Sequence, residues 1–342
     1  MNLEEVARRA KVSTATVSRV LNEVGQVKTS TRARVLKAAQ ELKYHPNLHA
    51  RNLAGGKNRT IGMIVSNMEN PFFVDIYKAA EREARAKGYE LLLANTDYNP
   101  EYLVNHIRMM IGRRVSGLAL VISEMDSSLI QELSDGNIPV VFYDVGTPKH
   151  NISNIAVNYA KGIERIVNYL HALGHRRMAF ISHHPNLGPL SVREHAFRET
   201  VVRISPPIKW QIAVSADGLE GGREATREIF ASGFDPTAII CVNDFMALGV
   251  LHELRQAGIS VPGDVSVTGF DNVQLASVCS PSLTTVHVER ERIGHLMFQS
   301  LTEASPVAEA CRRKIVLDPE FVVRESTGPA RKRIAFAELR PA

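Results

Sequence analysis

The stretch YHPNLHARNLAGGKNRTIG, residues 44–62, decides how this chain is divided. Pro46 ends the helical pattern before it, because proline disfavours the α conformation in the preceding residue. Leu48–Ala54 can form a short helix, and the pair Gly55–Gly56 then loosens the chain before a β-prone segment. A helix of about two turns is marginal in water. We therefore expect a hinge whose helix depends on its surroundings, as a conformational switch requires.

Charge and composition separate the two sides of this hinge. Residues 1–59 carry 12 Lys/Arg against 4 Asp/Glu, a balance of +8, whereas the whole 342-residue chain is +5, which leaves −3 for the remainder. A basic head on a mildly acidic body predicts a polyanionic partner for the head. A solvated basic face is the alternative, and charge alone does not decide between them.

The chain of 342 residues is long enough for two domains or more. Its expected location is the cytoplasm, in association with the nucleoid. No run of 18 apolar residues occurs, and the N-terminal MNLEEVARRA lacks the apolar core of a signal peptide. The three cysteines include no CxxC pair, which suits a reducing compartment and gives no support for a metal site.

Three short helices are predicted before the hinge. Asn2 and Glu5 have the spacing of a capping box at the start of the first. Ser13 should cap a second helix, Thr14–Asn22, and a third follows Thr29–Ser30. The residues expected to face inward at helical spacing are Val6, Ala7, Ala10, Val17, Val20, Leu21, Val35, Leu36, Ala39 and Leu42.

The tight turn between the first two helices predicts a helix-turn-helix. The N-terminal part of a recognition helix is the part that meets base edges. Arg19 could contact guanine through two hydrogen bonds, and Thr16 and Ser18 could contact bases or phosphates. A surface helix in a protein-binding module is the alternative. The DNA-binding candidates are Thr14, Ala15, Thr16, Ser18 and Arg19.

In the body, strand-like and helix-like segments alternate with short links. Such alternation predicts parallel sheets with helices on both faces. The rhythm restarts after a predicted helix at Asn158–Leu173, which suggests two similar lobes. The predicted strands are 61–66, 89–95, 115–122 and 138–144 before that helix, and 177–182, 210–216, 238–244 and 264–271 after it.

Ligands of such sheets lie beyond the carboxyl ends of the strands. Asn and Asp side chains there could recognise hydroxyl groups, and Asn70–Phe73 could supply an apolar face beside them. A helix N-cap is the alternative for the aspartates; we favour the cap for Asp244 and the ligand role for Asn243 and Asp271. The polar strand ends are Ser66–Asn67, Asn95, Asp144, Ser182–His184, Asn243–Asp244 and Asp271.

Three motifs resemble the LacI/GalR (lactose-repressor) family of bacterial transcription regulators: LEEVARRAKVSTATVSRVLN (3–22), VKTSTRARVLKAAQELKYHPN (27–47) and ARNLAGGKNRTIG (50–62). The resemblance implies an all-α helix-turn-helix head (1–46), a hinge helix with its linker (47–59) and an α/β effector and dimerisation domain (60–342). That domain is expected to have the two-lobe, type I periplasmic-binding-protein-like fold with parallel sheets. The expected lobes are about 60–158 with 289–318, and about 159–288 with 319–330.

The resemblance also assigns the hinge a role on DNA. In this family two hinge helices lie in the minor groove and a leucine from each wedges the central base step. Leu53 matches that leucine, and His49, Arg51 and Asn52 are polar or basic neighbours that suit a groove. The alternative for Leu53 is ordinary packing between domains.

For the effector, the resemblance points to individual positions. Arg193 in SVREHAF matches the family's effector-contacting arginine, although Ala196 replaces the usual glycine. Asn243 matches ND-xx-ALG, Asp271 matches GFD, and Asp144 matches an aspartate of sugar-binding members. The predicted effector site is Asn70, Phe72, Phe73, Asp144, His183, Arg193, Asn243 and Asp271.

Several departures leave the effector's identity open. Asn158 is preceded by Val where many members have Asp, Val288 replaces a polar residue, and His183–His184 replace a small pair. Together with Arg193, which favours a carboxylate or phosphate, the histidines could contact an acidic sugar. The expected effector is a small sugar or a sugar acid. Adjacent histidines on a strand point in opposite directions, and no metal or cofactor is expected.

No enzyme motif occurs: there is no G-x-S-x-G, G-x-x-x-x-G-K-[ST], H-E-x-x-H or G-x-G-x-x-G. We expect a repressor of carbohydrate-utilisation genes whose partners are palindromic operator DNA, a small effector and a second copy of the chain, with no membrane partner. The tail after Ser326 lacks leucine heptads that would form a tetramer. Control by a phosphoprotein corepressor is an alternative, as is a solute-binding protein, which would not explain the head.

The wedge role of Leu53 gives a direct test. Leu53→Ala should weaken binding to a duplex selected by the wild-type protein, because the bent specific complex loses its wedge. Binding to a scrambled duplex should be largely retained, since phosphate contacts carry it. Fluorescence anisotropy over a range of salt concentrations measures both. Equal losses on the two duplexes would contradict the wedge.

Overall fold

The computed structural model describes residues 2–21, 25–44, 58–124, 127–136, 138–144, 151–183, 188–302 and 314–331. The chain divides into two compact units, residues 1–58 and 59–342. The hinge positions His49, Arg51, Asn52 and Leu53 lie outside the described residues, as does His184. Within the described ranges no helix has the length and apolar character needed to cross a membrane.

The first unit is a bundle of three helices: α1 (Leu3–Ala10), α2 (Thr14–Leu21) and α3 (Thr29–Glu41). Both predicted caps are confirmed. At α1 the Asn2 side chain accepts from the Glu5 N–H, and the Glu5 carboxylate accepts from the Asn2 N–H, each at 3.0 Å. At α2 the Ser13 Oγ accepts from the Thr16 N–H at 3.2 Å. These caps satisfy N–H groups that the first turn of a helix leaves unpaired.

The apolar positions of the three helices meet in one small core, but one prediction in α3 is wrong. Leu36 was expected to face inward, yet it is 48% exposed, and Ala38 is buried in its place. The inward stripe of α3 runs through Val35, Ala38 and Ala39, and Leu36 lies about 100° around the helix from Val35, beyond this stripe.

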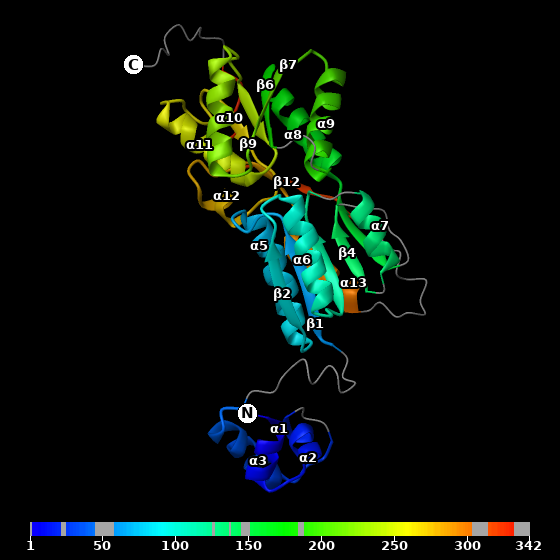
Figure 1. The fold of residues 1–342 in the computed structure, drawn as a ribbon. Helices are drawn as coiled ribbons and strands as arrows, with labels where there is room; N and C mark the ends of the chain where they lie inside the picture. The colour runs from blue at the N-terminus through cyan, green and yellow to red at the C-terminus, as the bar shows by residue number, and fades with distance from the viewer. Residues whose placement is uncertain are drawn as a thin grey trace. The chain divides into compact units, whose positions relative to one another are not determined.

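The second unit begins with a six-stranded sheet in the order β11-β5-β4-β3-β1-β2, in which every neighbouring pair is parallel. Helices α5 and α13 cover one face and α6 and α7 the other (Figure 1). The strands are β1 (Thr60–Val65), β2 (Glu90–Asn95), β3 (Gly117–Val121), β4 (Val140–Tyr143), β5 (Ile152–Val157) and β11 (Lys314–Leu317), and the helices are α5 (Pro71–Ala86), α6 (Pro100–Gly112), α7 (Ser127–Asp135) and α13 (Arg290–Thr302).

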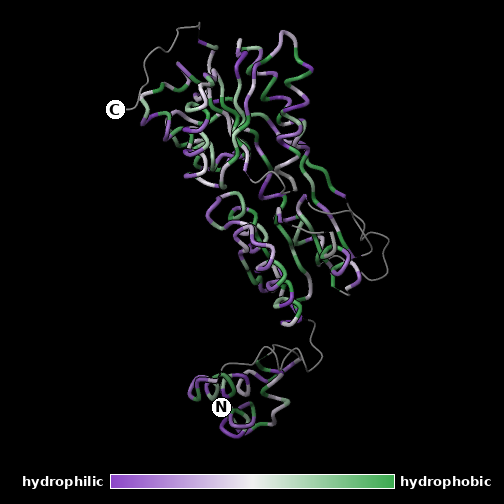
Figure 2. Tube along the Cα trace, turned by 45° about the horizontal axis from the view of Figure 1, so that its top comes forward, coloured by the Kyte–Doolittle hydropathy of each residue, from purple (hydrophilic) through white to green (hydrophobic). Residues whose placement is uncertain are grey.

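Alternate residues of each strand point to opposite faces of the sheet and join different cores. In β4, Val141 and Tyr143 join the core under α5 and α13, whereas Val140 and Phe142 join the core under α6 and α7. Since side chains alternate along a strand, a strand covered on both faces must be apolar throughout. The strands at the centre of each lobe are mostly hydrophobic in Figure 2, while the covering helices contain both hydrophobic and hydrophilic residues.

A second, four-stranded parallel sheet has the order β7-β6-β8-β9. Helices α8 and α9 lie on one side and α10 and α11 on the other (Figure 1). The strands are β6 (Arg177–His183), β7 (Lys209–Ser215), β8 (Ala238–Cys241) and β9 (Ser266–Thr268), and the helices are α8 (Tyr159–Ala172), α9 (Gly188–Arg203), α10 (Leu219–Ala231), α11 (Asp244–Gln256) and the short α12 (Gln274–Val278).

Four strands were not predicted: β5, β10 (Thr285–His287), β11 and β12 (Glu320–Val322). The chain passes from one lobe to the other after β5, after β10 and between β11 and β12, and the four strands border these crossings. β10 and β12 pair as an antiparallel ribbon. Three or four residues are too few to give a periodic pattern, and the polar pair Ser153–Asn154 interrupts β5.

Helices α10 and α11 approach each other closely through glycine. A Cβ placed on Gly249 would lie 2.0 Å from the Leu219 carbonyl oxygen, and one on Gly222 would lie 2.1 Å from that of Met246. Backbone atoms cannot move away as the end of a side chain can, so the contact requires a residue without a Cβ, which is glycine.

Gly249→Ala should therefore lower the free energy of unfolding of the second unit by about 2–3 kcal/mol, as overpacking does. Gly112→Ala is the matched control, because a Cβ in this last turn of α6 meets no atom within 4 Å. It should be neutral or slightly stabilising, since alanine favours helix. Urea denaturation measures both, and equal midpoints for the two variants would refute the close contact.

Candidate functional site

The predicted DNA-contacting residues lie on one side of α2. Thr14, Ala15 and Arg19 are exposed, and Thr16 and Ser18 are partly buried. The Thr16 hydroxyl lies 3.0 Å from the Ser13 hydroxyl, so it also takes part in the cap. A groove beside Arg19 is lined by further cations, Lys28 and Arg32. Exposed hydroxyls next to a basic groove can contact both base edges and phosphates.

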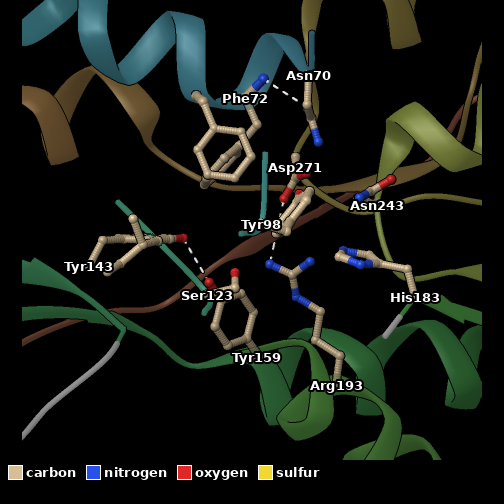
Figure 3. Close-up of a pocket in the computed structure, with 12 residues that line it drawn as sticks. Asn70, Phe72, Tyr98, Ser123, Tyr143, Tyr159, His183, Arg193, Asn243 and Asp271 are labelled. Atoms are coloured by element: carbon tan, nitrogen blue, oxygen red, sulfur yellow. Dashed lines mark hydrogen bonds and ion pairs between the residues drawn. The ribbon is translucent and has the colours of Figure 1, made fainter. Parts of the chain in front are cut away.

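The second unit contains a cavity at the carboxyl ends of the strands of both sheets (Figure 3). It is narrow, because the centres of water molecules can occupy only about 30 Å³ of it, which is space for roughly two waters. Seven of the eight predicted effector residues line it, the exception being Asp144. The full lining is Asn70, Phe72, Phe73, Tyr98, Ile122, Ser123, Tyr143, Tyr159, His183, Arg193, Asn243 and Asp271.

The start of α5 supplies an aromatic wall. Asn70 caps the helix by accepting from the Phe72 N–H at 3.0 Å, and Pro71 occupies the first helical position. The Phe72 ring then packs edge-on against Phe73, with centroids 5.4 Å apart, and lies 5.6 Å from Tyr143. The cap and the proline thus fix the position at which the two phenylalanines enter the cavity.

Arg193 projects from α9 into the cavity and is 5% exposed. Its guanidinium lies 4.1 Å from the centre of the Tyr159 ring and 4.6 Å from that of Phe270, and its Nη1 donates to the Val242 carbonyl at 2.7 Å. Burial alone would lower its pKa, but Tyr159, Asp271 and Tyr143 raise it above the ordinary value. The group therefore remains a cation, fixed by two rings and one carbonyl.

Asp271 faces this cation. Its Oδ1 lies 3.8 Å from Arg193 Nη2, its backbone φ is +112°, and burial raises its pKa to about 7 although Arg193 and Arg290 lower it. Neither Asp271 Oδ1 nor Arg193 Nε has a hydrogen-bond partner among the described residues. Buried polar atoms are normally paired, so this donor and acceptor are available to a ligand, and the strained backbone is typical of a functional site.

The assignments of Asn243 and Asp244 need correction. Asn243, not Asp244, caps α11, since its Oδ1 accepts from the Met246 N–H at 2.8 Å, and it lines the cavity as well. Asp244 is fully buried and accepts from the Val273 N–H at 2.8 Å and the Thr285 hydroxyl at 2.5 Å. Both residue types can cap a helix, so the sequence did not show at which of the two the helix begins.

Asp144 does not line the cavity. Its carboxylate accepts from the Val157 N–H at 2.8 Å and from the Tyr159 hydroxyl, so it lies behind Tyr159. We therefore revise its expected role from contacting the effector to positioning Tyr159. Val288 is buried among apolar residues and is also absent from the lining.

Sequence reasoning missed several lining residues. Tyr98 and Ser123 follow the predicted strands that became β2 and β3, so position beyond a strand end was the available signal. Tyr143 was hidden as a strand residue, and Tyr159 follows β5, which was not predicted.

Comparisons with known proteins agree with this architecture. Residues 2–47 match the bacterial regulatory proteins of the lacI family, and residues 167–327 match a periplasmic binding protein-like domain. The HTH-type transcriptional repressor PurR of Vibrio campbellii is 36% identical over 332 residues, which cover 95% of this chain and 98% of that protein. The Lac repressor dimer bound to operator and the anti-inducer ONPF is similar in structure, with a TM-score of 0.82, 27% identity and coverage of 96% and 99%. The transcriptional regulator CelR in complex with cellobiose has a TM-score of 0.67, 26% identity and coverage of 95% and 99%.

Three carboxyl groups at and behind the cavity make stability depend on pH. Burial raises the pKa of Asp144 to about 6, of Asp271 to about 7 and of Asp244 to about 8, whereas an aspartate in the unfolded chain titrates near pH ~3.9. Between these values the folded state binds more protons than the unfolded state. Their contribution to the free energy of unfolding therefore falls as the pH rises from about 4 to about 8.

Asp244→Asn should make this fall shallower, by at most about 1.4 kcal/mol per pH unit. The amide oxygen can still accept from the Val273 N–H, and the amide nitrogen can donate to the Thr285 hydroxyl oxygen. Urea denaturation at intervals from pH 5 to pH 8 measures the slope. Asp135→Asn, which changes an exposed aspartate of α7, is the control and should leave the slope unchanged. Parallel slopes for wild type and Asp244→Asn would be inconsistent with a protonated Asp244.

Proposed function

Because the chain belongs to the lacI family of bacterial transcriptional repressors, we propose that it binds a palindromic operator as a homodimer under the control of a small polar effector in the cavity of its second unit. It is a DNA-binding repressor and not an enzyme. The Lac repressor structure is a dimer on its operator, which supports the same assembly here. Two recognition helices about one DNA turn apart would then read the two half-sites.

The effector that fits the cavity best is a sugar or a sugar acid. The observation that carries this is that Arg193 Nε, and Asp271 Oδ1 facing the same guanidinium, have no hydrogen-bond partner among the described residues. A sugar hydroxyl can accept from the first and donate to the second, and a carboxylate would pair with the guanidinium. The wall of Phe72 and Phe73 offers an apolar face to a sugar ring. The cellobiose complex of CelR supports a carbohydrate in this fold.

The size of the cavity links effector binding to a change of shape. A space for roughly two waters does not hold a sugar, so the lobes must part or the lining must rearrange when the effector enters. An effector with different affinities for the two arrangements shifts the balance between them. A difference of about 1.4 kcal/mol shifts that balance tenfold, within the usual range of allosteric coupling. The marginal hinge helix would then form or melt in response.

Removing the guanidinium should separate effector binding from DNA binding. Arg193→Ala should abolish binding of the effector, because the buried Asp271 loses its cation, while operator binding remains and no longer responds to effector. Titration calorimetry with neutral monosaccharides, sugar acids and nucleobases identifies the effector. Electrophoretic mobility shifts with and without it then measure the response.

Arg198→Ala is the matched control on the same helix, since Arg198 is exposed and pairs with Glu194. It should retain the wild-type response. Unchanged effector affinity in Arg193→Ala would mean that the cavity is not the effector site. Binding of a nucleobase alone, with no heat from any sugar, would contradict the proposed effector class.

A further inference from the structure

Beside the cavity lies a buried carboxylate that neither the sequence motifs nor the proposed effector contacts involve. Asp217 follows β7 and precedes α10, and its side chain is only 2% exposed. A carboxylate removed from water is strongly unfavourable unless hydrogen bonds or opposite charges surround it. Its partners therefore show what keeps it there.

The two carboxylate oxygens are divided between the two lobes. Oδ2 accepts from Asn67 Nδ2 at 3.1 Å and from the Tyr98 hydroxyl at 2.7 Å, and these two residues follow β1 and β2 of the six-stranded sheet. Oδ1 accepts from Asn243 Nδ2 at 2.8 Å and lies 4.0 Å from His183 Nε2, and these residues follow β8 and end β6 of the four-stranded sheet. Oδ2 is thus bound to the lobe of the six-stranded sheet, and Oδ1 is bound to the lobe of the four-stranded sheet.

The donors from the first lobe are held in place by their own surroundings. Asp97 and Tyr98 have backbone φ angles of +51° and +59°, a left-handed conformation that is uncommon for a bulky residue. The turn is fixed by the Tyr98 N–H, which donates to the Ser66 carbonyl at 3.2 Å. Asn67 Oδ1 accepts from the Glu69 N–H at 2.8 Å, which directs its amide nitrogen toward Asp217. The left-handed conformation of Asp97 and Tyr98 persists only where the surroundings enforce it.

We propose that Asp217 locks the two lobes together, because its carboxylate joins Asn67 and Tyr98 of one lobe to Asn243 and His183 of the other. Separation of the lobes breaks both hydrogen bonds to Oδ2 and leaves the contacts of Oδ1 within their own lobe. The lock therefore acts on the closed form alone and sets the ratio of closed to open molecules without effector. The inference goes beyond the proposed function and stands whatever the effector is.

The charge state of Asp217 agrees with this role. Burial alone would raise its pKa, but His183, Asn243, Tyr98 and Asn67 together hold the pKa below its ordinary value. The group therefore stays an anion at neutral pH, and hydrogen bonds to an anion are stronger than those to a neutral group. Tyr98, His183 and Asn243 also line the cavity, so a ligand there contacts side chains that form the lock.

The test measures the separation of the lobes in the full-length chain without effector. Spin labels at Glu101→Cys on α6 and Glu228→Cys on α10, both exposed, report the distance between lobes by double electron–electron resonance. Cys279 and Cys311 are replaced beforehand. Wild type should show mainly the short distance. Asp217→Asn and Tyr98→Phe should each raise the ratio of open to closed molecules, by roughly tenfold for the loss of about 1.4 kcal/mol.

Tyr102→Phe is the control, since it removes the hydroxyl of an exposed tyrosine in the same lobe, and it should match wild type. Tyr98→Phe removes a single oxygen atom, and circular dichroism verifies that it folds. A lower melting temperature with an unchanged distance distribution would assign Asp217 a purely structural role and overturn the lock. Wild type that is mainly open would overturn it too. Because no effector is present, these results are independent of the calorimetry that tests the effector class.

Discussion

The second unit depends on ionised groups that lie at the boundary between its two lobes, from which most water is excluded. Arg193 is fixed between the rings of Tyr159 and Phe270, and the buried anion Asp217 and the buried carboxyl group of Asp271 lie at the same boundary. Charges in such a place must be surrounded by partners, and these partners come from strand ends of both sheets. The requirement explains why the polar residues of an otherwise apolar fold gather at the carboxyl ends of its strands, and why moving one lobe affects several charges at once.

The sequence predicted what depends on local pattern and missed what depends on contacts between distant segments. Local pattern was enough for the longer strands, which alternate with helices, for the caps at Asn2 and Ser13, and for the residues just beyond the strand ends. Each of these follows from a few neighbouring residues. Strands β10 and β12 were too short to show a period, and Asp144 proved to lie behind Tyr159. No spacing relates Asp217 to Tyr98, 119 residues away, so only the fold could reveal their contact.

The family resemblance was confirmed by comparisons that cover almost the whole chain, and it carries different weight for fold and for ligand. The fold rests on many apolar positions, each of which tolerates exchange for a similar side chain. Ligand choice rests on a few polar atoms, where one changed residue alters the set of donors and acceptors. His183, which lines the cavity, is one such polar residue. The proposed effector class therefore rests on the cavity's own chemistry.

One strand connects the parts that must communicate. β1 begins at Thr60, directly after the hinge segment, and Asn67, two residues past its end, donates to Asp217 of the other lobe. β1 lies between β2 and β3 in the sheet, so it cannot bend freely and moves with its lobe as a rigid element. On the proposed lock, a shift at Asn67 would therefore reach Thr60 through one rigid strand. The sequence predicts a helix of about two turns before this strand, and a helix of that length is near its own stability limit. The proposal therefore requires only a small displacement of Thr60 to change whether the helix forms.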